Sequence, residues 1–357
     1  MRAADGRRLF LSLYLTVSLL TIFTSNDIII LTFTPFIYYF AKSAGIDPKP
    51  YLIAEFFAAN TWSMMLYIGN PTNILLAAAF GLKFVEYTKW MLLPTLAAGA
   101  VNFFLLYALF HKEIKKPIVV DGKIKPADAI TDKPGAIIGL SSLAACIIAL
   151  AVAPYFGIEM WIVSLVFAVA MAIVLFARDS SVAILRRSIS KMPLSVGSTM
   201  ARMPWAVVPF VLSLFITVEA LRVYGVADAV GRLFVGFCGN SPAANIFAYG
   251  IASAVSANAL NNIPMTLAFT YVIQGASGAL SIASVFAAAL ATTIGSNLGA
   301  NLTPIGALAG IMWMSILTGK DFHLSFLEFA KYGLLITPIA LIACLGVLAL
   351  EFLLWGF

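Results

Sequence analysis

The sequence predicts an all-α polytopic membrane protein made of inverted repeats, each with a re-entrant hairpin and a broken transmembrane helix. Hydrophobic residues make up 62% of the 357-residue chain and charged residues 11%, with a mean hydropathy of +0.99. An average soluble domain carries roughly 25% charged residues. Apolar segments of about 17 to 25 residues recur along the chain, each long enough to cross a hydrocarbon core of about 30 Å. The third observation is a duplicated order of motifs.

The duplicated motifs are a polar corner, a helix broken by Gly or Pro, and a Glu-x-x-Lys pair beside aromatic residues. They occupy residues 24–28, 69–74 and 84–93 in the first copy, and residues 260–263, 301–305 and 326–335 in the second. The charged pairs are Glu86 with Lys89 and Glu328 with Lys331. We expect each pair to lie in a short amphipathic segment at the membrane interface, linking a broken helix to the next span.

The first transport repeat is predicted at residues 1–110. Its hairpin, residues 9–40, is an apolar block that a polar corner divides into two arms of about 15 residues, shorter than the roughly 20 residues of a full span. Because lipid offers non-helical backbone no hydrogen bonds, the corner must be buried in protein or line a cavity. Residues 51–80 would extend about 45 Å as one helix. Residues 69–71, Gly-Asn-Pro, break this helix because proline removes a donor, and residues 89–110 then form a span.

A lysine-rich loop, residues 111–135, follows the first repeat. The positive-inside rule predicts that this loop is cytoplasmic. Residues 136–221 are predicted to form three scaffold helices. The second basic loop, residues 178–202, lies between the second and third of these helices and returns to the same side.

The second transport repeat is predicted at residues 222–357, with a hairpin at 243–275, a broken helix at 281–318 and a span at 330–356. The chain enters the first repeat from the cytoplasmic side of the membrane and the second repeat from the outer side. The two repeats therefore have opposite orientations, which makes them an inverted repeat. Three spans precede the second repeat, whereas only eight residues precede the hairpin of the first repeat. We therefore expect the chain to be a fragment or truncated form that lacks about three N-terminal helices.

Candidate binding residues gather at the two corners and the two helix breaks. Half-helix N-termini offer free N–H groups and a positive dipole end, while unwound carbonyls bind cations. The candidates are Ser25, Asn26, Asp27, Asn70, Thr72, Asn73, Asn258, Asn261, Asn262, Thr266, Ser296, Asn297, Asn301 and Thr303. A bland alternative is that such residues only hold helices together, at about 0.6 kcal/mol per contact. Eight or more of them at four breaks favour a binding site.

Among these residues Asp27 is the only acid. An ionisable group inside a membrane is costly and usually faces a path or a partner. Its counterpart in the second copy is the neutral Asn262. We therefore expect a cation or proton site near the first hairpin, with a possible sodium site at Asn26, Asp27 and Asn70. A further acid, Glu55, is predicted either to line the cavity or to lie at the interface.

Several classes of protein are excluded by the residues that the sequence carries. Cys146, Cys238 and Cys344 are distant and lie in apolar contexts, so neither a disulfide framework nor a metal site is indicated. His111 and His323 fall at segment ends, and no ATP-binding Gly-x4-Gly-Lys-Ser/Thr motif occurs. The basic residues sit in loops, which excludes a nucleic-acid-binding face. We expect no enzyme activity, no cofactor and no resident metal.

At these motifs the chain resembles the ion transporter superfamily, which groups arsenite efflux permeases, NhaD-type sodium/proton antiporters, citrate permeases and divalent-anion/sodium symporters. The resemblance covers almost the whole chain and is greatest to the arsenite permeases. It is carried by residues 25–27 with Thr34 and Pro35, by residues 261–266, by residues 69–73 and by residues 302–309. One departure is Asn60-Thr61, where arsenite permeases are expected to have an acidic residue.

The resemblance implies a secondary active transporter of the plasma (inner) membrane whose hairpin tips and broken helices bind solute and ion. The implied activity is efflux of arsenite, antimonite or another small inorganic or organic anion, coupled to a proton or sodium gradient. The implied partners are that anion, the coupling ion, membrane lipid and possibly a second copy of the chain. Two alternatives stay open: a sodium-coupled citrate or dicarboxylate symporter, and a non-transporting truncated membrane subunit.

Overall fold

The computed structural model is all-α apart from two short strands. It describes residues 2–115, 117–120, 133–186, 197, 205, 207–320 and 322–356. Strand β1 (Arg2–Asp5) pairs antiparallel with β2 (Pro117–Val120), with Arg2 opposite Val120. The chain divides into two compact units, Met1–Gly122 with Leu214–Phe357, and Lys123–Ser213.

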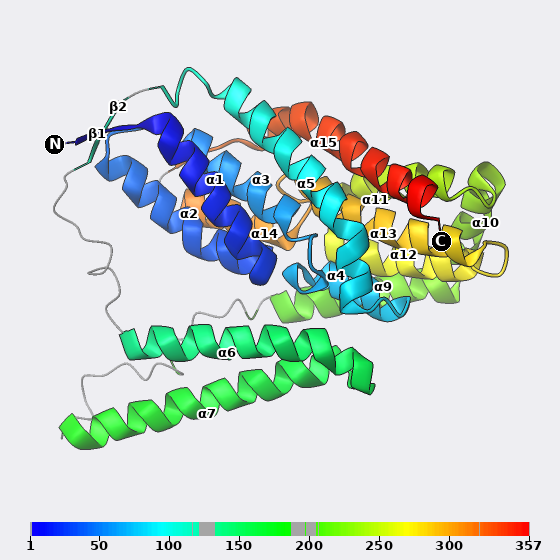
Figure 1. The fold of residues 1–357 in the computed structure, drawn as a ribbon, viewed down its shortest axis with the longest axis horizontal. Helices are drawn as coiled ribbons and strands as arrows, with labels where there is room; N and C mark the ends of the chain where they lie inside the picture. The colour runs from blue at the N-terminus through cyan, green and yellow to red at the C-terminus, as the bar shows by residue number, and fades with distance from the viewer. Residues whose placement is uncertain are drawn as a thin grey trace. The chain divides into compact units, whose positions relative to one another are not determined.

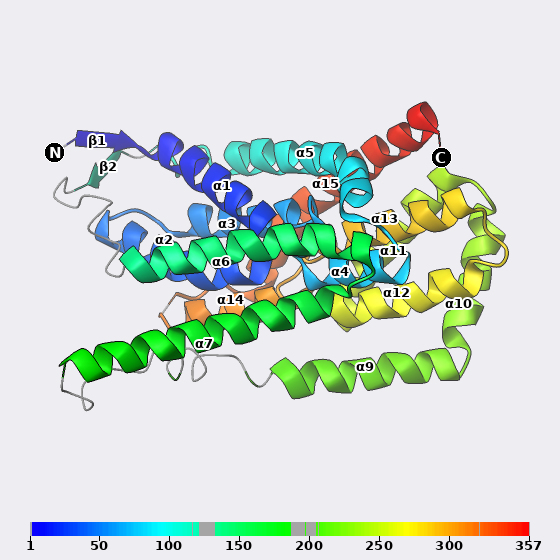
Figure 2. The ribbon, with the colours of Figure 1, turned by 60° about the horizontal axis from the view of Figure 1, so that its bottom comes forward.

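The first half of the larger unit begins with a helical hairpin. The chain turns back at Thr24 and Ser25, so that the second helix returns toward the end where the first begins (Figures 1 and 2). A helix interrupted over residues 63–70 and one long helix follow. The elements are α1 (Gly6–Phe23), α2 (Asn26–Ser43), α3 (Lys49–Trp62), the 3-10 turn η1 (Tyr67–Gly69), α4 (Pro71–Ala79) and α5 (Phe84–Leu109).

Local chemistry explains where this interruption ends. The side chain of Asn70 caps α4 by accepting a hydrogen bond from the Thr72 N–H, and Pro71 occupies the first helical turn. Proline is favoured there because that N–H would have no intrahelical partner. A Cβ at Gly69 would lie 2.2 Å from the carbonyl oxygen of Ser63, so only glycine fits this close approach.

The second half of the larger unit repeats this order. It starts with the end of α9 (Val207–Val223) and a helix that the sequence did not predict, α10 (Val226–Cys238). A hairpin, a helix interrupted over residues 300–307 and a long helix follow. These elements are α11 (Pro242–Leu260), α12 (Asn262–Ala276), α13 (Ile282–Gly299), α14 (Leu308–Thr318) and α15 (Phe326–Trp355).

The helices α3 and α13 form the centre of the unit. All side chains from Pro50 to Thr61 are buried, and so is nearly all of α13. A helix that is buried on every side belongs to the interior of a bundle. Helix α13 packs closely on α11 because both present small residues; a Cβ at Gly299 would lie 2.5 Å from the carbonyl oxygen of Ala254.

The packing between the two halves is reciprocal. Helix α2 packs on α14, and α12 packs on α4. The long helices α5 and α15 run antiparallel, because the Trp90 ring lies 5.7 Å from the Trp355 ring and the Phe110 ring 5.3 Å from that of Tyr332. The two hairpins extend from opposite ends toward the middle (Figures 1 and 2). Oppositely oriented repeats require such contacts, and the inverted repeat itself stays a prediction.

The Glu-x-x-Lys pairs do not lie in separate interfacial segments, so that expectation is wrong. Both pairs belong to the first turns of continuous helices, α5 and α15. Glu328 forms an ion pair with Lys49, with 2.7 Å between Nζ and Oε1, rather than with Lys331. This ion pair joins the start of the first broken helix to the start of the last span.

The smaller unit holds α6 (Lys133–Val152), the 3-10 turn η3 (Ala153–Phe156), α7 (Met160–Arg186) and the first residues of α9. Helix α7 continues through Arg178 to Arg186, so the predicted basic loop 178–202 starts later than expected. The rest of that loop, and most of the loop 111–135, lie outside the described residues. Large apolar side chains of α6 and α7 are exposed, as for helices that face lipid.

Seven described helices are long and apolar enough to cross a membrane, as judged by length and composition. They are Gly6–Phe23, Phe84–Leu109, Pro134–Val152, Met160–Arg178, Pro242–Leu260, Ile282–Gly299 and Phe326–Trp355. The first arm of each hairpin is therefore longer than the sequence predicted. The re-entrant character of the hairpins stays a prediction.

Candidate functional site

The two helix breaks lie side by side and are joined by buried asparagine side chains. Asn60, near the end of α3, accepts a hydrogen bond from Asn26 Nδ2 at 3.0 Å. Its own Nδ2 donates to Asn301 Oδ1 at 3.0 Å. All three side chains are at most 1% exposed. One row of amides thus links the first hairpin, the first broken helix and the second break.

Asn297, near the end of α13, reaches the other break in the same way. Its Oδ1 accepts from Ser63 Oγ at 2.8 Å and from Asn70 Nδ2 at 2.9 Å. Its Nδ2 donates to Asn73 Oδ1 at 2.7 Å. Asn73 Nδ2 in turn donates to the carbonyl oxygens of Ser63 and Leu66, which the interruption has released from the helix.

Asn60 and Asn297 occupy matching positions, each two residues before the last residue of its helix. Each contacts the break that belongs to the other half of the chain. Asn60 and Ser63 were not predicted as site residues, and Asn60 was predicted only as a departure from an expected acid. Aligning the two broken helices by their C-terminal ends, instead of by their Asn-Pro and Thr-Pro motifs, would have paired Asn60 with Asn297.

The tip of the second hairpin is held against the second break. Asn258 Oδ1 accepts from Thr303 Oγ1 at 2.6 Å, and its Nδ2 donates to the Gly299 carbonyl at 2.9 Å. The Asn262 N–H donates to the Gly306 carbonyl at 3.0 Å. Thr266 Oγ1 lies within hydrogen-bond distance of Ser296 Oγ, at 3.2 Å. These contacts join α11, α12 and α13 around the break.

Asn261 forms the tip itself in an unusual backbone conformation, with φ of 70° and ψ of 151°. This region is populated almost only by glycine and costs a non-glycine residue about 1–3 kcal/mol. The Asn261 side chain caps α12 by accepting from the Ile263 N–H, and its Nδ2 donates to the Ile305 carbonyl. Backbone strain of this kind is often found at binding sites.

The tip of the first hairpin is less constrained. Ser25 precedes α2 without a capping hydrogen bond, and Asp27 lies in the first turn, where the helix dipole favours a carboxylate. Asp27 is partly buried, and no hydrogen bond to its side chain is found among the described residues. Asn26 bonds to Asn60 and Asn70 bonds to Asn297. The possible sodium site at Asn26, Asp27 and Asn70 stays a prediction.

Two buried polar atoms of the row of amides have no partner within the part of the chain that the structure describes. They are Asn26 Oδ1, an acceptor, and Asn301 Nδ2, a donor. Buried polar side chains are almost always hydrogen-bonded, so an unpaired acceptor at one end of the row and an unpaired donor at the other end require an explanation. A small solute with both hydrogen-bond donors and acceptors would satisfy them.

The network contains neutral groups only. Its members are amides and hydroxyls, and the described residues include no cluster of three or more His, Cys, Asp and Glu that could hold a metal ion. Thr72 is buried beside the network, and its hydroxyl lies 3.4 Å from Asn73 Oδ1. This chemistry suits a solute that is recognised by hydrogen bonds rather than by charge pairing.

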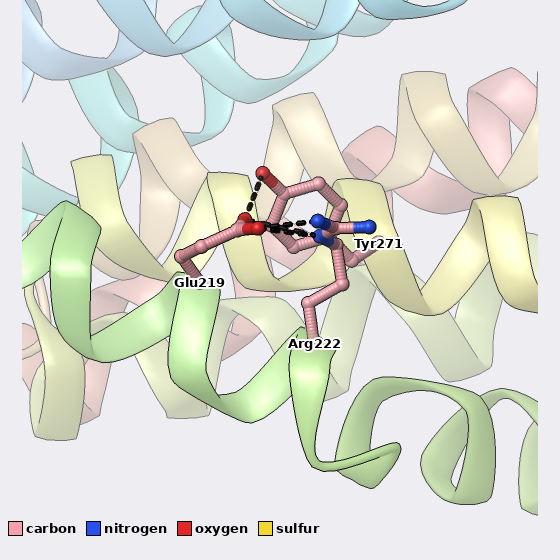
Figure 3. Close-up of polar contacts among 3 residues, drawn as sticks. All are labelled: Glu219, Arg222 and Tyr271. Carbon is pink, nitrogen blue, oxygen red and sulfur yellow. Dashed lines mark hydrogen bonds and ion pairs between the residues drawn. The ribbon is translucent and has the colours of Figure 1, made fainter.

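Glu55 is buried within the protein, and its location relative to the membrane stays a prediction. Its side chain is 1% exposed and lies between α2, α3 and α14. Glu219 and Arg222, three residues apart on α9, form an ion pair: Arg222 Nε donates to Glu219 Oε1 at 2.9 Å, and the Tyr271 hydroxyl donates to Oε2 at 2.9 Å (Figure 3). This exposed group joins α9 to α12 and makes no contact with the asparagine network.

Comparison with known proteins gives one family and several relatives. The family described as CitMHS, a citrate transporter family, matches residues 1–295. The arsenical pump membrane protein of Yersinia enterocolitica is 29% identical over 351 residues, which cover 97% of this chain and 78% of the relative. That of Escherichia coli (strain K12) is 28% identical with the same coverage. The putative arsenical pump membrane protein of Bacillus subtilis (strain 168) is 25% identical over 357 residues, which cover 95% and 77% of the two chains.

Proposed function

Because the chain belongs to the citrate transporter family and is an integral membrane transporter, we propose that it carries a small oxygen-rich inorganic anion, or its neutral acid, by secondary active efflux. The observation that carries this proposal is the buried row Asn26, Asn60 and Asn301, with an unfilled acceptor at one end and an unfilled donor at the other. Arsenite or antimonite is the substrate that the relatives named as arsenical pump membrane proteins favour.

The chemistry of arsenite fits a site made of amides and hydroxyls. Arsenite at neutral pH is an uncharged acid with three hydroxyl groups, each able to donate and accept a hydrogen bond. The three cysteines are free, and no group of three or more His, Cys, Asp and Glu side chains that could hold a metal ion is found among the described residues. The site is proposed to bind the oxygen atoms of the solute and not to form bonds between sulfur and the metalloid.

The proposed binding residues are the predicted set together with two that the structure adds. Asn26, Asn60 and Asn301 would contact the solute, and the Asn297 group would hold the first break in the shape that this contact needs. Ser25 and Asp27 are proposed to face the coupling ion, because Asp27 is ionisable and has no hydrogen-bond partner within the described part of the chain. The full set is Ser25, Asn26, Asp27, Asn60, Ser63, Asn70, Thr72, Asn73, Asn258, Asn261, Asn262, Thr266, Ser296, Asn297, Asn301 and Thr303.

Transport is proposed to follow from movement of the two hairpins and two broken helices relative to the other spans. The hydrogen bonds of Asn60 and Asn297 tie the breaks to each other, which favours a movement of both as one body. The coupling ion is proposed to be a proton or sodium. The basic loops 111–135 and 178–202 are proposed to be cytoplasmic, and a homodimer in the plasma (inner) membrane stays a prediction.

Flux into sealed vesicles tests the proposal. The purified chain in liposomes is offered arsenite, antimonite or citrate under an imposed pH gradient, a sodium gradient or none. Concentrative movement of arsenite or antimonite under one gradient supports the proposal. Movement of citrate alone with sodium selects the symporter alternative, which the family description favours. Failure to move any of them under every gradient favours a non-transporting subunit and overturns the proposal.

A further inference from the structure

We propose that Glu55 is the proton carrier of this transporter: its carboxyl group takes up and releases the proton that is exchanged for solute. This inference rests on the proposed function and names its coupling ion. It starts from the position of the side chain. Glu55 is 1% exposed and lies in the middle of α3, the first half of the first broken helix.

The Glu55 carboxyl contacts two of the other elements that form the site. Thr34 Oγ1 of α2 lies 3.0 Å from Oε1 and 3.1 Å from Oε2. Trp313 Nε1 of α14 donates to Oε2 at 3.4 Å. One carboxyl thus joins the first hairpin, the first broken helix and the second half of the other broken helix. A change in its protonation acts on all three elements at once.

The hydrogen bonds around Thr34 fit a protonated carboxyl. Thr34 Oγ1 lies 2.6 Å from the carbonyl oxygen of Ile30, which is its shortest contact. A hydroxyl group has one proton to donate and two lone pairs to accept with. When that proton goes to Ile30, the contact between Thr34 and Glu55 is a hydrogen bond only if the carboxyl donates. Trp313 then donates to the other carboxyl oxygen.

Within the described part of the chain no counter-ion compensates a charge on Glu55. Among the described residues no ion pair includes it, and α14, Leu308–Thr318, carries no ionisable side chain. Glu328 of α15 is already paired with Lys49, and Asp27 of α2 lies two turns from Thr34. A buried carboxylate without a partner is strongly disfavoured, so the charged form belongs to a state in which water reaches the group. The other ionisable side chains on α1, α2 and α15 are Arg7, Arg8, Tyr14, Tyr38, Tyr39, Lys42, Lys331, Tyr332, Cys344 and Glu351. Those on α5, which also packs on α3, are Glu86, Tyr87, Lys89 and Tyr107.

The position of Glu55 links it to the proposed solute site. Helices α2 and α3 run antiparallel, because Asn26 bonds to Asn60 at one end of their interface and Thr34 bonds to Glu55 further along. Eight residues of α2 separate these two contacts, or about 12 Å of helix. The same interface therefore carries both the unfilled acceptor of the solute site and the carboxyl.

Release and uptake of one proton by the Glu55 carboxyl conserve atoms and charge. On the side where the interface opens to water, the O–H bond of the Glu55 carboxyl breaks, the proton passes to water and the carboxylate forms. On the other side the carboxylate takes a proton from water and becomes neutral. The neutral form returns through the closed state, where α2, α3 and α14 pack as described. No oxidant, reductant or metal is needed.

Transport by Glu55→Gln in liposomes tests the coupling. Glutamine keeps the size and the hydrogen bonds but cannot release a proton. We expect arsenite accumulation driven by a pH gradient, which for one proton per solute can reach about tenfold per pH unit, to fall to the level without a gradient, while exchange of solute for solute continues. Glu351→Gln, at a second buried carboxyl far along α15, is the matched control and should keep gradient-driven accumulation.

Infrared difference spectroscopy tests the protonation without any transport. At neutral pH the wild-type protein should show the C=O stretch of a protonated carboxyl that is missing in Glu55→Gln and present in Glu351→Gln. Absence of this difference would overturn the proposal. Should Glu55→Gln fail to fold, Thr34→Val keeps the carboxyl and removes its partner. It should shift the pH dependence of transport, and an unchanged pH profile would count against the proposal.

The outcomes separate this inference from the proposed function. A wild-type protein that moves no solute removes the proposed function, while the infrared band still decides whether Glu55 holds a proton. A wild-type protein that moves arsenite with a sodium gradient alone keeps the proposed function and overturns Glu55 as the coupling group. If Glu55→Gln accumulates arsenite under a pH gradient as well as the wild type does, Glu55 is likewise overturned as the coupling group.

Discussion

Replacement of Asn60 by alanine is the most direct test of the asparagine network. The substitution removes the acceptor for Asn26 Nδ2 and the donor to Asn301 Oδ1. Because Asn26 Oδ1 and Asn301 Nδ2 already have no partner in the described part of the chain, both amides would then be entirely unpaired. Few single substitutions in this structure would remove so much of the polar site.

The expected cost can be bracketed. At the average of about 0.6 kcal/mol for hydrogen bonds between membrane helices, two lost bonds cost about 1 kcal/mol. If each orphaned buried amide instead costs about 1–3 kcal/mol, the total is about 2–6 kcal/mol. The second figure applies better, because Asn26 and Asn301 are buried in protein and have no alternative partner. We expect a loss of about 2–4 kcal/mol in solute binding and folding together.

Two measurements on purified protein check this value. Solute affinity in liposomes should fall at least about tenfold, since about 1.4 kcal/mol corresponds to a factor of ten, and thermal unfolding in detergent should occur at a lower temperature. Asn245→Ala is the control, because Asn245 is also fully buried and donates to two carbonyls at 3.1 and 2.9 Å at the start of α11. It should lose stability but keep the solute affinity of the wild type. Wild-type affinity in Asn60→Ala would refute the role given to the network.

Three further predictions follow from other features. Gly310→Ala places a Cβ 2.1 Å from a backbone carbonyl of the second break, so the variant should express poorly or lose transport, whereas Gly346→Ala, with open space around it, should behave as the wild type in the same expression and flux assays. Asp27→Asn should fold normally and keep solute exchange but change the dependence of flux on the imposed ion gradient; unaltered coupling in vesicles would contradict the role proposed for Asp27. The hydrogen bond from Lys49 to Glu328 raises the pKa of Lys49, so the pair contributes its stability below the ordinary lysine value of about 10.4 and loses it as pH rises through the higher folded value. Since both side chains are about a third exposed, Glu328→Gln should cost at most about 1 kcal/mol near neutral pH, and a thermal-unfolding difference that grows with pH would contradict this assignment.

The sequence predicted the elements whose cause is local. The corner at Asn26 and the break at Pro71 follow from polar and Pro/Gly residues inside apolar segments, and both are present in the structure. The first break starts earlier than predicted, at Ser63, because the chain needs eight residues to form η1 and bring Gly69 against the Ser63 carbonyl. The Gly69-Asn70-Pro71 motif predicts where that break ends, but no residue pattern in the sequence predicts where it begins.

The pairings between distant parts of the chain could not be predicted in this way. Asn60 lies in an apolar helix with no break at its own position, and its importance comes from Asn301, which only the fold brings near. The partner of Glu328 was predicted three residues away, but the structure places Lys49 closer. Local spacing favours the near partner, whereas the packing of α3 beside α15 decides the actual one.

The reciprocal contacts of Asn60 and Asn297 limit how this architecture can be divided. Each amide completes the break of the other half of the chain, so a protein with one half alone would hold half of each hydrogen-bond set. In the predicted inverted arrangement, such a half could build the site only by pairing with a second copy inserted in the membrane the other way up. Gene duplication and fusion would then be required for the asymmetry between Asp27 and Asn262, because two identical copies cannot carry a charge on one side only.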